Sequence, residues 1–327
     1  MKTNVVVIGG GNGSAVTINA LKEHTDVFDI SAVIAVSDSG GSSGRLREEF
    51  YTLPPGDLMR AILAMSKYEY KLLKQIFYKN RFKDVGKLNA HNLGNLFLIL
   101  SKQYDGDIVH AMRALEQSVE AVGRVYPVTL DVVHLCAELT DGTTVKTEAV
   151  LDEPTYDRGK KIKRVWLEPE GKVYEGAKKV IVDARHILLS AGSLYTSVIA
   201  GLLVGGMKEA IMESKAKLVY IAGDTYETEG ETGPERLSDF IKQLELYLPR
   251  PLDMVLYNNC ELDEVQRKKY EEKKWRVFEK DLENIPAGRN VVGVDYETAE
   301  GSLSPTKLGK VLVDTIHETR KTIQRDT

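Results

Sequence analysis

Glycine and small polar residues gather directly after apolar runs, where phosphate chemistry would need them. Residues 9–13 read Gly-Gly-Gly-Asn-Gly and follow the fully apolar run 5–8. Glycine lets the backbone approach a ligand closely, and a helix that begins here would point free N–H groups and its positive dipole end at an anion. We therefore predict a phosphate-binding loop, with a simple strand-to-helix turn as the alternative. Its candidate ligand residues are Gly9, Gly10, Gly11, Asn12 and Gly13.

A second loop of the same character follows the next apolar run, 30–36. Residues 37–47 read Ser-Asp-Ser-Gly-Gly-Ser-Ser-Gly-Arg-Leu-Arg. Backbone N–H groups in such turns, with hydroxyl and guanidinium groups beside them, suit anionic oxygens. Asp38 can hold a ribose hydroxyl, a metal ion or a substrate proton, and a mobile surface loop is the alternative for the whole segment. The candidate ligand residues here are Asp38, Ser39, Gly40, Gly41, Ser42 and Arg45.

Two more polar clusters precede helix-like segments. Asp57, in the run 54–60, falls in the first turn of a predicted helix, where it can cap the helix or bind a ligand. The run 91–95 reads His-Asn-Leu-Gly-Asn, and its lone histidine can be structural or can contact a ligand. Asp38 and Asp57 are also the candidate oxygen ligands of Mg²⁺. The candidate ligand residues of these two clusters are Asp57, His91, Asn92 and Asn95.

The order of strand, small polar loop and helix recurs in the second half of the chain. Residues 191–197 and 223–233 follow the apolar runs 187–189 and 217–221. Loops at the carboxyl ends of parallel strands lie at one edge of a sheet, so the recurrence predicts a composite site there. Further candidate ligand residues are Gly192, Ser193, Tyr195, Thr196, Thr225 and Glu231. Ser14 stands where the dinucleotide fingerprint requires glycine, which argues against a nicotinamide cofactor.

The elements that carry these loops predict an α/β protein. Short apolar runs alternate with helical periodicity, which indicates a Rossmann-like, mostly parallel sheet with helices on both faces and an inserted antiparallel and helical subdomain. We predict one domain over 1–327, with a core of 1–55 and 181–300, an insertion of 56–180 and a C-terminal helix of 305–323. Predicted helices include 58–65, 70–78, 94–103, 108–122 and 194–204. Residues 126–150 alternate and contain an Asp-Gly turn at 141–142, so they predict an antiparallel excursion, and 151–180 can continue it or form a loop.

Composition restricts the class of partner. The chain has 327 residues, a formal net charge of −4, 43% hydrophobic and 28% charged residues. That balance gives no basic excess for nucleic acid, and no run of 18 apolar residues predicts a membrane span. Cys136 and Cys260 lie far apart and are expected to be unpaired, as in a reducing compartment. We therefore expect a cytoplasmic protein that does not enter a membrane or bind nucleic acid.

Five motifs in order resemble one family. They are Gly-Gly-Gly-Asn-Gly at 9–13, the Ser-Asp-Ser-Gly-Gly loop at 37–47, Pro-Pro-Gly-Asp-Leu at 54–58, His-Asn-Leu-Gly-Asn-Leu at 91–96 and Gly-Ser-Leu-Tyr-Thr-Ser at 192–197. Together they resemble the YvcK-type gluconeogenesis factors, relatives of the 2-phospho-L-lactate transferase CofD. The serine-rich loop at 37–47 is similar to the YvcK branch, whereas the transferase branch carries an acidic pattern there.

The resemblance implies a ligand and two functions. The YvcK branch implies binding of a UDP-sugar such as UDP-N-acetylglucosamine, with Tyr270 matching a ligand-linked tyrosine, and a role in central carbon metabolism and in cell-wall and cell-shape control without an established reaction. The alternative is a 2-phospho-L-lactate transferase-like enzyme that uses a nucleotide-activated donor and Mg²⁺. No catalytic residue is assigned at this stage. The expected assembly is a homodimer.

Overall fold

The computed structural model describes residues 2–286 and 288–323. Its centre is a seven-stranded sheet in the order β3-β2-β1-β7-β8-β10-β12, and every neighbouring pair in it is parallel. This is the strand order of a doubly wound dinucleotide-binding fold. The strands are β1 (Thr3–Gly9), β2 (Phe28–Ile34), β3 (Arg124–Pro127), β7 (His186–Leu189), β8 (Lys217–Gly223), β10 (Met254–Asn258) and β12 (Asn290–Val294).

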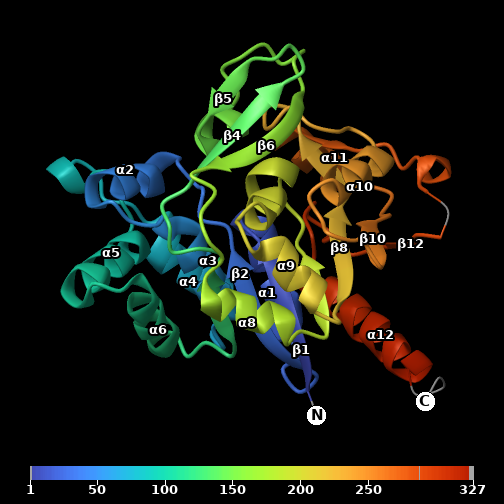
Figure 1. Cartoon of the computed structure of the whole chain (residues 1–327), viewed down its shortest axis with the longest axis horizontal. Helices are drawn as coiled ribbons and strands as arrows, with labels where there is room; N and C mark the ends of the chain where they lie inside the picture. Colours follow the sequence, from blue (N-terminus) through green and yellow to red (C-terminus); the bar gives the residue numbers. More distant parts are fainter. Residues whose placement is uncertain (1, 287, 324–327) are drawn as a thin grey trace.

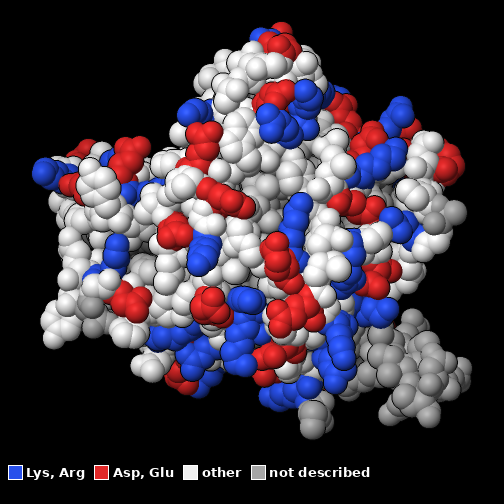
Figure 2. Space-filling model, in the orientation of Figure 1, with Lys and Arg blue, Asp and Glu red and all other residues white. Residues whose placement is uncertain are grey.

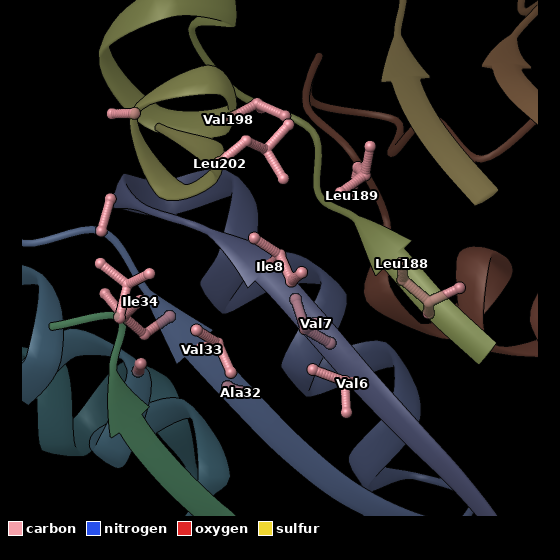
Figure 3. Packing of buried hydrophobic residues seen from close by; sticks show 14 of the residues in the cluster. Val6, Val7, Ile8, Ala32, Val33, Ile34, Leu188, Leu189, Val198 and Leu202 are labelled. Carbon is pink, nitrogen blue, oxygen red and sulfur yellow. The ribbon is translucent and has the colours of Figure 1, made fainter. Parts of the chain in front are cut away.

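The central strands are buried on both faces, which explains why their sequences are apolar throughout rather than alternating. Val5 to Ile8 in β1 are at most 1% exposed. Figure 3 shows the side chains of β1 beside those of β2 and β7, with Val198 and Leu202 extending toward the end of β1 where Ile8 lies. These contacts fix the spacing of the loops that leave the carboxyl ends of β1, β2 and β7.

Helices cover both faces of the sheet. Helix α1 (Gly11–Lys22) packs between α3 (Pro55–Met65) and α12 (Pro305–Ile323) on one face. Helices α8 (Glu175–Val182) and α9 (Met207–Glu213) pack against each other and lie in front of the strands in Figure 1. From β1 the chain winds toward β3, and from β7 it winds toward β12. The direction therefore reverses between β1 and β7, and this reversal is where such folds bind ligands.

A small antiparallel lobe stands over the carboxyl edge of the main sheet (Figure 1). It contains β4 (His134–Leu139), β5 (Thr144–Lys146), β6 (Ile162–Glu168) and α7 (Glu148–Asp152), with the strand order β5-β4-β6. The predicted Asp-Gly turn joins β4 to β5, and Gly142 there has φ +86°. The polar stretch after residue 151 continues the lobe, because β6 lies within it.

Three predicted elements differ from the structure. The antiparallel excursion does not begin at residue 126, because β3 continues the main sheet beside β2 and Val128 still donates its N–H to the carbonyl of Ile34. The predicted helix 194–204 is a π-helical turn, η3 (Leu194–Val198), followed by a 3₁₀ turn, η4 (Ile199–Leu202), rather than an α-helix. The predicted helix 70–78 is a short α-helix, α4 (Tyr70–Leu73), that continues as a π-helix, η1 (Lys74–Lys79). The first difference also means that the predicted insertion 56–180 contains a strand of the core sheet.

The remaining elements surround this frame. On the β2–β3 connection they are α2 (Gly41–Phe50), α4 (Tyr70–Leu73), the π-helix η1 (Lys74–Lys79), η2 (Gly86–Leu88), α5 (Leu93–Asp105) and α6 (Ile108–Ser118). After β8 they are β9 (Thr225–Glu227), α10 (Leu237–Glu245), α11 (Glu264–Glu272), β11 (Trp275–Val277) and η5 (Leu282–Asn284). Cys136 and Cys260 are both free thiols, as expected. Among the described residues, no helix combines the length and the apolar character that crossing a bilayer requires.

Candidate functional site

A cavity of about 740 Å³ opens at the carboxyl ends of the strands, where the winding direction reverses. Its volume lies within the range of roughly 300–1,000 Å³ typical of small-molecule sites. The loops after β1, β2, β7 and β8 all reach it, together with α7 of the lobe and residues of α3, η1 and α11. The four loops that the sequence singled out therefore meet at one place.

The β1–α1 loop is shaped by close backbone contacts. A Cβ atom on Gly13 would lie 1.7 Å from the carbonyl oxygen of Ala191, so only glycine lets the β1 and β7 loops meet. Gly11 has φ +59°, which is the left-handed conformation that glycine adopts without strain. Its N–H donates to Asp57 Oδ2 over 2.9 Å. A carboxylate of the protein itself thus lies at the anion position of the α1 N-terminus.

Asp57 reaches across to α1 rather than capping its own helix. Its Oδ2 accepts from the N–H of Gly11, and its Oδ1 pairs with Arg60 Nη1 over 3.2 Å. Asp38, in the β2–α2 loop, accepts from the N–H of Gly40 over 2.9 Å. Burial, and then the charge of Asp57, raise the pKa of Asp38 to about 6. The two carboxylates therefore repel each other on one wall of the cavity.

The two arginines of the β2–α2 loop have different positions. Arg47 is buried and donates to the carbonyl oxygens of Ser37 and Asp38 over 3.2 and 3.3 Å, which holds the loop in place. Arg45 donates to the carbonyl of Asn89 over 2.9 Å and does not line the cavity. Ligand charge at this site must therefore be balanced by other cations.

Those cations come from α3, from η1 and the residues after it, and from the C-terminal end of α11. Arg60, Lys74, Arg81 and Lys273 line the cavity and are called here the cationic wall. The ring of Tyr78 gathers three of them, with the Arg60 guanidinium 4.7 Å, Lys74 Nζ 6.0 Å and the Arg81 guanidinium 5.6 Å from its centroid. Burial and the nearby charges of Arg60, Lys79 and Lys273 lower the pKa of Lys74 to about 8. The wall therefore holds crowded positive charge that an anion would stabilise.

The lobe brings acidic side chains to the cavity. Glu148 of α7 accepts from the N–H of Ser39 over 3.2 Å, and the N–H of Ala149 donates to Ser39 Oγ over 2.9 Å. This reciprocal pair ties α7 to the β2–α2 loop. Burial, and then the charge of Asp38, raise the pKa of Glu148 to about 8. Asp152, also on α7, lines the cavity and has a pKa raised by burial.

The β7 loop repeats the arrangement seen at α1. Glu231 Oε2 accepts from the N–H groups of Tyr195 and Thr196, both over 3.0 Å, at the start of η3. Burial raises the pKa of Glu231 to about 7. The ring of Tyr195 is buried behind the loop, whereas Thr196 lines the cavity. Backbone donors are again held by a protein carboxylate.

A buried polar cluster surrounds Tyr270 at the part of the cavity wall formed by α11. Tyr270 Oη donates to Glu297 Oε2 over 3.0 Å and contacts Asp224 Oδ1 at 3.3 Å. Asn258 Nδ2 donates to the same Glu297 oxygen over 2.7 Å. Burial raises the pKa of Asp224 to about 6 and that of Glu297 to about 7, so this pair holds a proton near neutral pH. Trp275 packs edge-on against Tyr270 and also lines the cavity.

Several polar atoms of the wall have no hydrogen-bond partner among the described protein atoms. They are Ser37 Oγ, Asn95 Oδ1, Tyr70 Oη and Arg60 Nε, and all four residues line the cavity. Buried polar atoms in folded proteins are almost always hydrogen-bonded. A polar ligand would satisfy them, which supports a binding role for this cavity.

The carboxylates also bear on metal binding. Within 2–286 and 288–323 there is no group of three or more His, Cys, Asp or Glu side chains arranged to hold a metal ion. Mg²⁺ keeps several waters and needs only one or two protein carboxylates when a ligand phosphate supplies the rest. Asp38 and Asp57 fit that requirement, since both line the cavity and the charge of Asp57 helps to raise the pKa of Asp38.

Most of the predicted ligand residues meet at the cavity. Its wall includes Gly11, Asn12, Gly13, Asp38, Gly40, Gly41, Ser42, Asp57, Asn95, Gly192, Ser193, Thr196, Thr225, Glu231 and Tyr270. Outside the wall lie Gly9, Gly10, Ser39, Arg45, His91, Asn92 and Tyr195. Sequence reasoning missed Arg60, Lys74, Tyr78, Arg81, Glu148 and Asp152, which also line it. The one sequence pattern that could have indicated them is the spacing of basic and aromatic residues over 70–81. The same pattern is equally typical of a solvent-exposed helix, so it does not predict a binding site.

Comparison with known proteins agrees with this geometry. The profile of the family described as "2-phospho-L-lactate transferase CofD" matches residues 5–296. The gluconeogenesis factor of Bacillus subtilis is 34% identical over 97% of this chain and 99% of its own length. That of Halalkalibacterium halodurans is 36% identical over 84% of this chain and 83% of its own.

A solved structure supports the same assignment. The crystal structure of a Bacillus halodurans protein of the upf0052 family superposes with a TM-score of 0.86 at 31% identity and covers 96% of this chain and 99% of that chain. The fold, the strand order and the sequence matches extend over nearly the whole chain. This chain belongs to the CofD family and, within it, to the YvcK-type gluconeogenesis factors.

Proposed function

We propose that this protein is a regulatory protein that binds a nucleotide-sugar of the UDP-N-acetylglucosamine type in the cavity between β1 and β7. The carrying observation is that one cavity of suitable volume joins a cationic wall, unpartnered polar atoms and an aromatic end. A nucleotide-sugar has three matching parts: a diphosphate, hydroxyl-rich sugars and a planar base. The names of the relatives support a role in carbon metabolism, and we extend the proposal to cell-wall and cell-shape control.

The diphosphate is proposed to lie against the cationic wall. Lys74 Nζ donates to Asn12 Oδ1 over 3.0 Å, which places the wall beside the β1–α1 loop. The Gly11 N–H is already held by Asp57, so phosphate oxygens can take it only by displacing that carboxylate. Arg60, which pairs with Asp57, is the group that would accompany such an exchange.

The other parts of the ligand have matching surroundings. The aromatic end around Tyr270 and Trp275 offers a face for stacking a base. Carboxylates and amides such as Asp152 and Asn95 offer acceptors and donors for sugar hydroxyls. Specific polar recognition of this kind distinguishes ligands more strongly than apolar contact does.

The test is a thermal-shift and calorimetric panel of UDP-N-acetylglucosamine, UDP, GDP, GTP and NAD, each with and without Mg²⁺. A ligand at a hundredfold excess over its Kd should stabilise the fold by about 2.7 kcal/mol. We expect selective stabilisation by the UDP-sugar, at a 1:1 ratio and without catalytic turnover. No response to UDP or to any UDP-sugar would refute the proposal.

One observation favours a second function. Asp38 and Asp57 form a facing carboxylate pair beside the glycine-rich loops, which suits a Mg²⁺-dependent phosphotransferase of the 2-phospho-L-lactate transferase type. Such a protein would respond to a guanine nucleotide only with Mg²⁺ and would form many products per chain. Multiple turnover abolished by Asp38→Asn would move the assignment to this enzyme.

A further inference from the structure

The hydroxyl group of Ser42 is hydrogen-bonded to both His91 and Asn95. Binding of a ligand alone would not require this arrangement. Ser42 is the second residue of α2, it lines the cavity, and its Oγ is 2.8 Å from His91 Nδ1. Asn95 Nδ2 donates to the same Oγ over 3.0 Å. A hydroxyl group has one proton and two lone pairs, and Asn95 takes one of the lone pairs. In the imidazole tautomer with its proton on Nε2, Nδ1 accepts the Ser42 hydroxyl proton, and this is the tautomer that the inference uses.

His91 has the surroundings of a base at neutral pH. It is 4% exposed and does not line the cavity, so it stands behind Ser42 as seen by a ligand. Burial, together with the charges of Arg45 and Arg81, holds its pKa below the usual range, and Glu49 opposes them. A lowered pKa favours the neutral imidazole, which is the form that can accept the hydroxyl proton. A nucleophile and a base within about 2.6–3.2 Å are the geometric signature of an activated hydroxyl.

Two further features stabilise charge on this oxygen. Ser42 lies in the first turn of α2, where the positive end of the helix dipole is located, and Asn95 Nδ2 donates a hydrogen bond to its Oγ. Asn95 Oδ1 is buried and has no partner among the described protein atoms, so the same side chain can also contact a ligand. The hydroxyl thus faces the ligand and the proton acceptor faces the interior.

We propose that Ser42 is a nucleophile that accepts a phosphoryl group from a phosphoanhydride bound in the cavity. Ser42 Oγ forms a bond to phosphorus while the bond from phosphorus to the leaving-group oxygen breaks and its electron pair departs with that oxygen. The hydroxyl proton moves to His91 Nδ1. The product is a phosphoserine when the attacked phosphoryl group is terminal, and a phosphodiester of Ser42 when that phosphorus carries the nucleoside or the sugar. Either product forms once per chain, which is compatible with a regulatory protein. This inference does not depend on which base or sugar the cavity selects.

The test uses a fluorophosphonate, whose phosphorus is attacked in the same way while fluoride leaves. Intact-mass and tandem mass spectrometry of the wild-type full chain should show one label, located on Ser42. Ser42→Ala should abolish it, and His91→Gln should slow it by about 100-fold or more, which is the usual contribution of a general base. Ser197→Ala is the matched control, because Ser197 lines the same cavity and is more exposed than Ser42.

Three outcomes would overturn the proposal. They are an unlabelled wild-type chain, a label that falls on Ser197 or on several serines alike, and labelling of His91→Gln at the wild-type rate. The last would make His91 a structural tie between α2 and α5. The site mapping on the wild-type chain needs no variant, so a folding defect in His91→Gln leaves the proposal falsifiable. Melting curves of each variant separate lost reactivity from lost fold, and labelling succeeds or fails whether or not any nucleotide-sugar binds.

Discussion

At the scale of a single residue, the lowered pKa of Lys74 predicts how ligand affinity depends on pH. Its pKa of about 8 means that the ammonium is charged below pH 8 and loses its proton above it. We expect the affinity for UDP-N-acetylglucosamine, measured by calorimetry, to fall as the pH rises from 7 to 9. A charge-assisted hydrogen bond contributes about 1.5–3 kcal/mol, so Lys74→Met should weaken binding roughly 10- to 100-fold at pH 7 and remove this pH dependence.

Lys79→Met is the matched control for that measurement. Lys79 lies on the same π-helix and contributes to the same electrostatic environment, but it does not line the cavity. Equal losses of affinity in the two variants would show that net charge, rather than contact with Lys74, governs binding. An unchanged affinity in Lys74→Met would place the anion elsewhere.

At the residue scale, the sequence could predict the close backbone approach of the glycine-rich loop. Within 9–13, Gly11, Asn12 and Gly13 line the cavity, because only glycine at position 13 permits the approach to Ala191, and glycine is visible in a sequence. The cationic residues that face the cavity were harder to predict from the sequence. Arg45 and Arg47 look alike in the sequence, but neither lines the cavity. Arg45 donates to the carbonyl of Asn89, and Arg47 donates to the carbonyl groups of Ser37 and Asp38. Arg60 escaped notice because it lies in a helix whose apolar residues indicate only a core position.

At the scale of elements, the contact between the β1 and β7 loops should be essential to the fold. Gly13→Ala places a Cβ atom 1.7 Å from a backbone oxygen, which cannot move without displacing the β7 loop. We expect a loss of at least about 1–3 kcal/mol in the free energy of unfolding, measured by urea titration. Gly40→Ala is the control, because its nearest neighbour would lie at 3.5 Å. Equal stability of the two variants would contradict this account.

The elements themselves were predicted well where one feature dominates the sequence. The apolar runs gave the buried parallel strands, since burial on both faces leaves no room for alternation. β3 was assigned to the excursion because Tyr126 and Val128 begin an alternating pattern before the chain leaves the main sheet. The segment 194–204 was predicted as one helix, and the sequence does not distinguish an α-helix from the π and 3₁₀ turns that form there. Glu231 accepts from the N–H of Thr196 at the start of η3, and local sequence cannot show this contact because the two residues lie 35 positions apart in the chain.

For the whole molecule, the buried acids determine how stability depends on pH. Asp38 and Asp224 have pKa values of about 6, Glu231 and Glu297 of about 7, and Glu148 of about 8. Unfolded carboxyl groups titrate near 4, so between pH 4 and 8 the folded chain binds more protons than the unfolded chain. Stability must then fall as the pH rises through this window.

Urea titrations of the ligand-free protein at pH 5, 6, 7 and 8 measure this effect. We expect the midpoint to be highest near pH 5 and to decline toward pH 8, and Glu148→Gln should flatten the upper part of the decline. Asp141→Asn is the control, since the Asp141 carboxylate is exposed and its pKa is lowered by Lys160. A midpoint that rises from pH 5 to 8 would show that these carboxyl groups are not buried as described.

The expected homodimer also belongs to this scale. Many of the large apolar side chains that remain exposed come from 68–104, among them Leu72, Ile76 and Leu100. Charges elsewhere are mixed, as Figure 2 shows for one face. Light scattering should give twice the chain mass, and Leu72→Glu combined with Ile76→Glu should give the chain mass. Met212→Glu is the control, because Met212 is equally exposed on α9. A wild-type monomer at working concentrations would exclude the dimer.

The carboxylates that hold the backbone donors of Gly11, Ser39 and Thr196 have a consequence for selectivity. Because the backbone donors already bind carboxylates of the protein, a small anion can bind them only by displacing a carboxylate that the fold holds nearby. Free phosphate makes few contacts and should compete poorly with these carboxylates. A nucleotide-sugar makes contacts at both of its ends and should displace them more readily. Every evicted carboxylate is then available to a cation, so anion and divalent metal should arrive as a linked pair, each tightening the hold on the other.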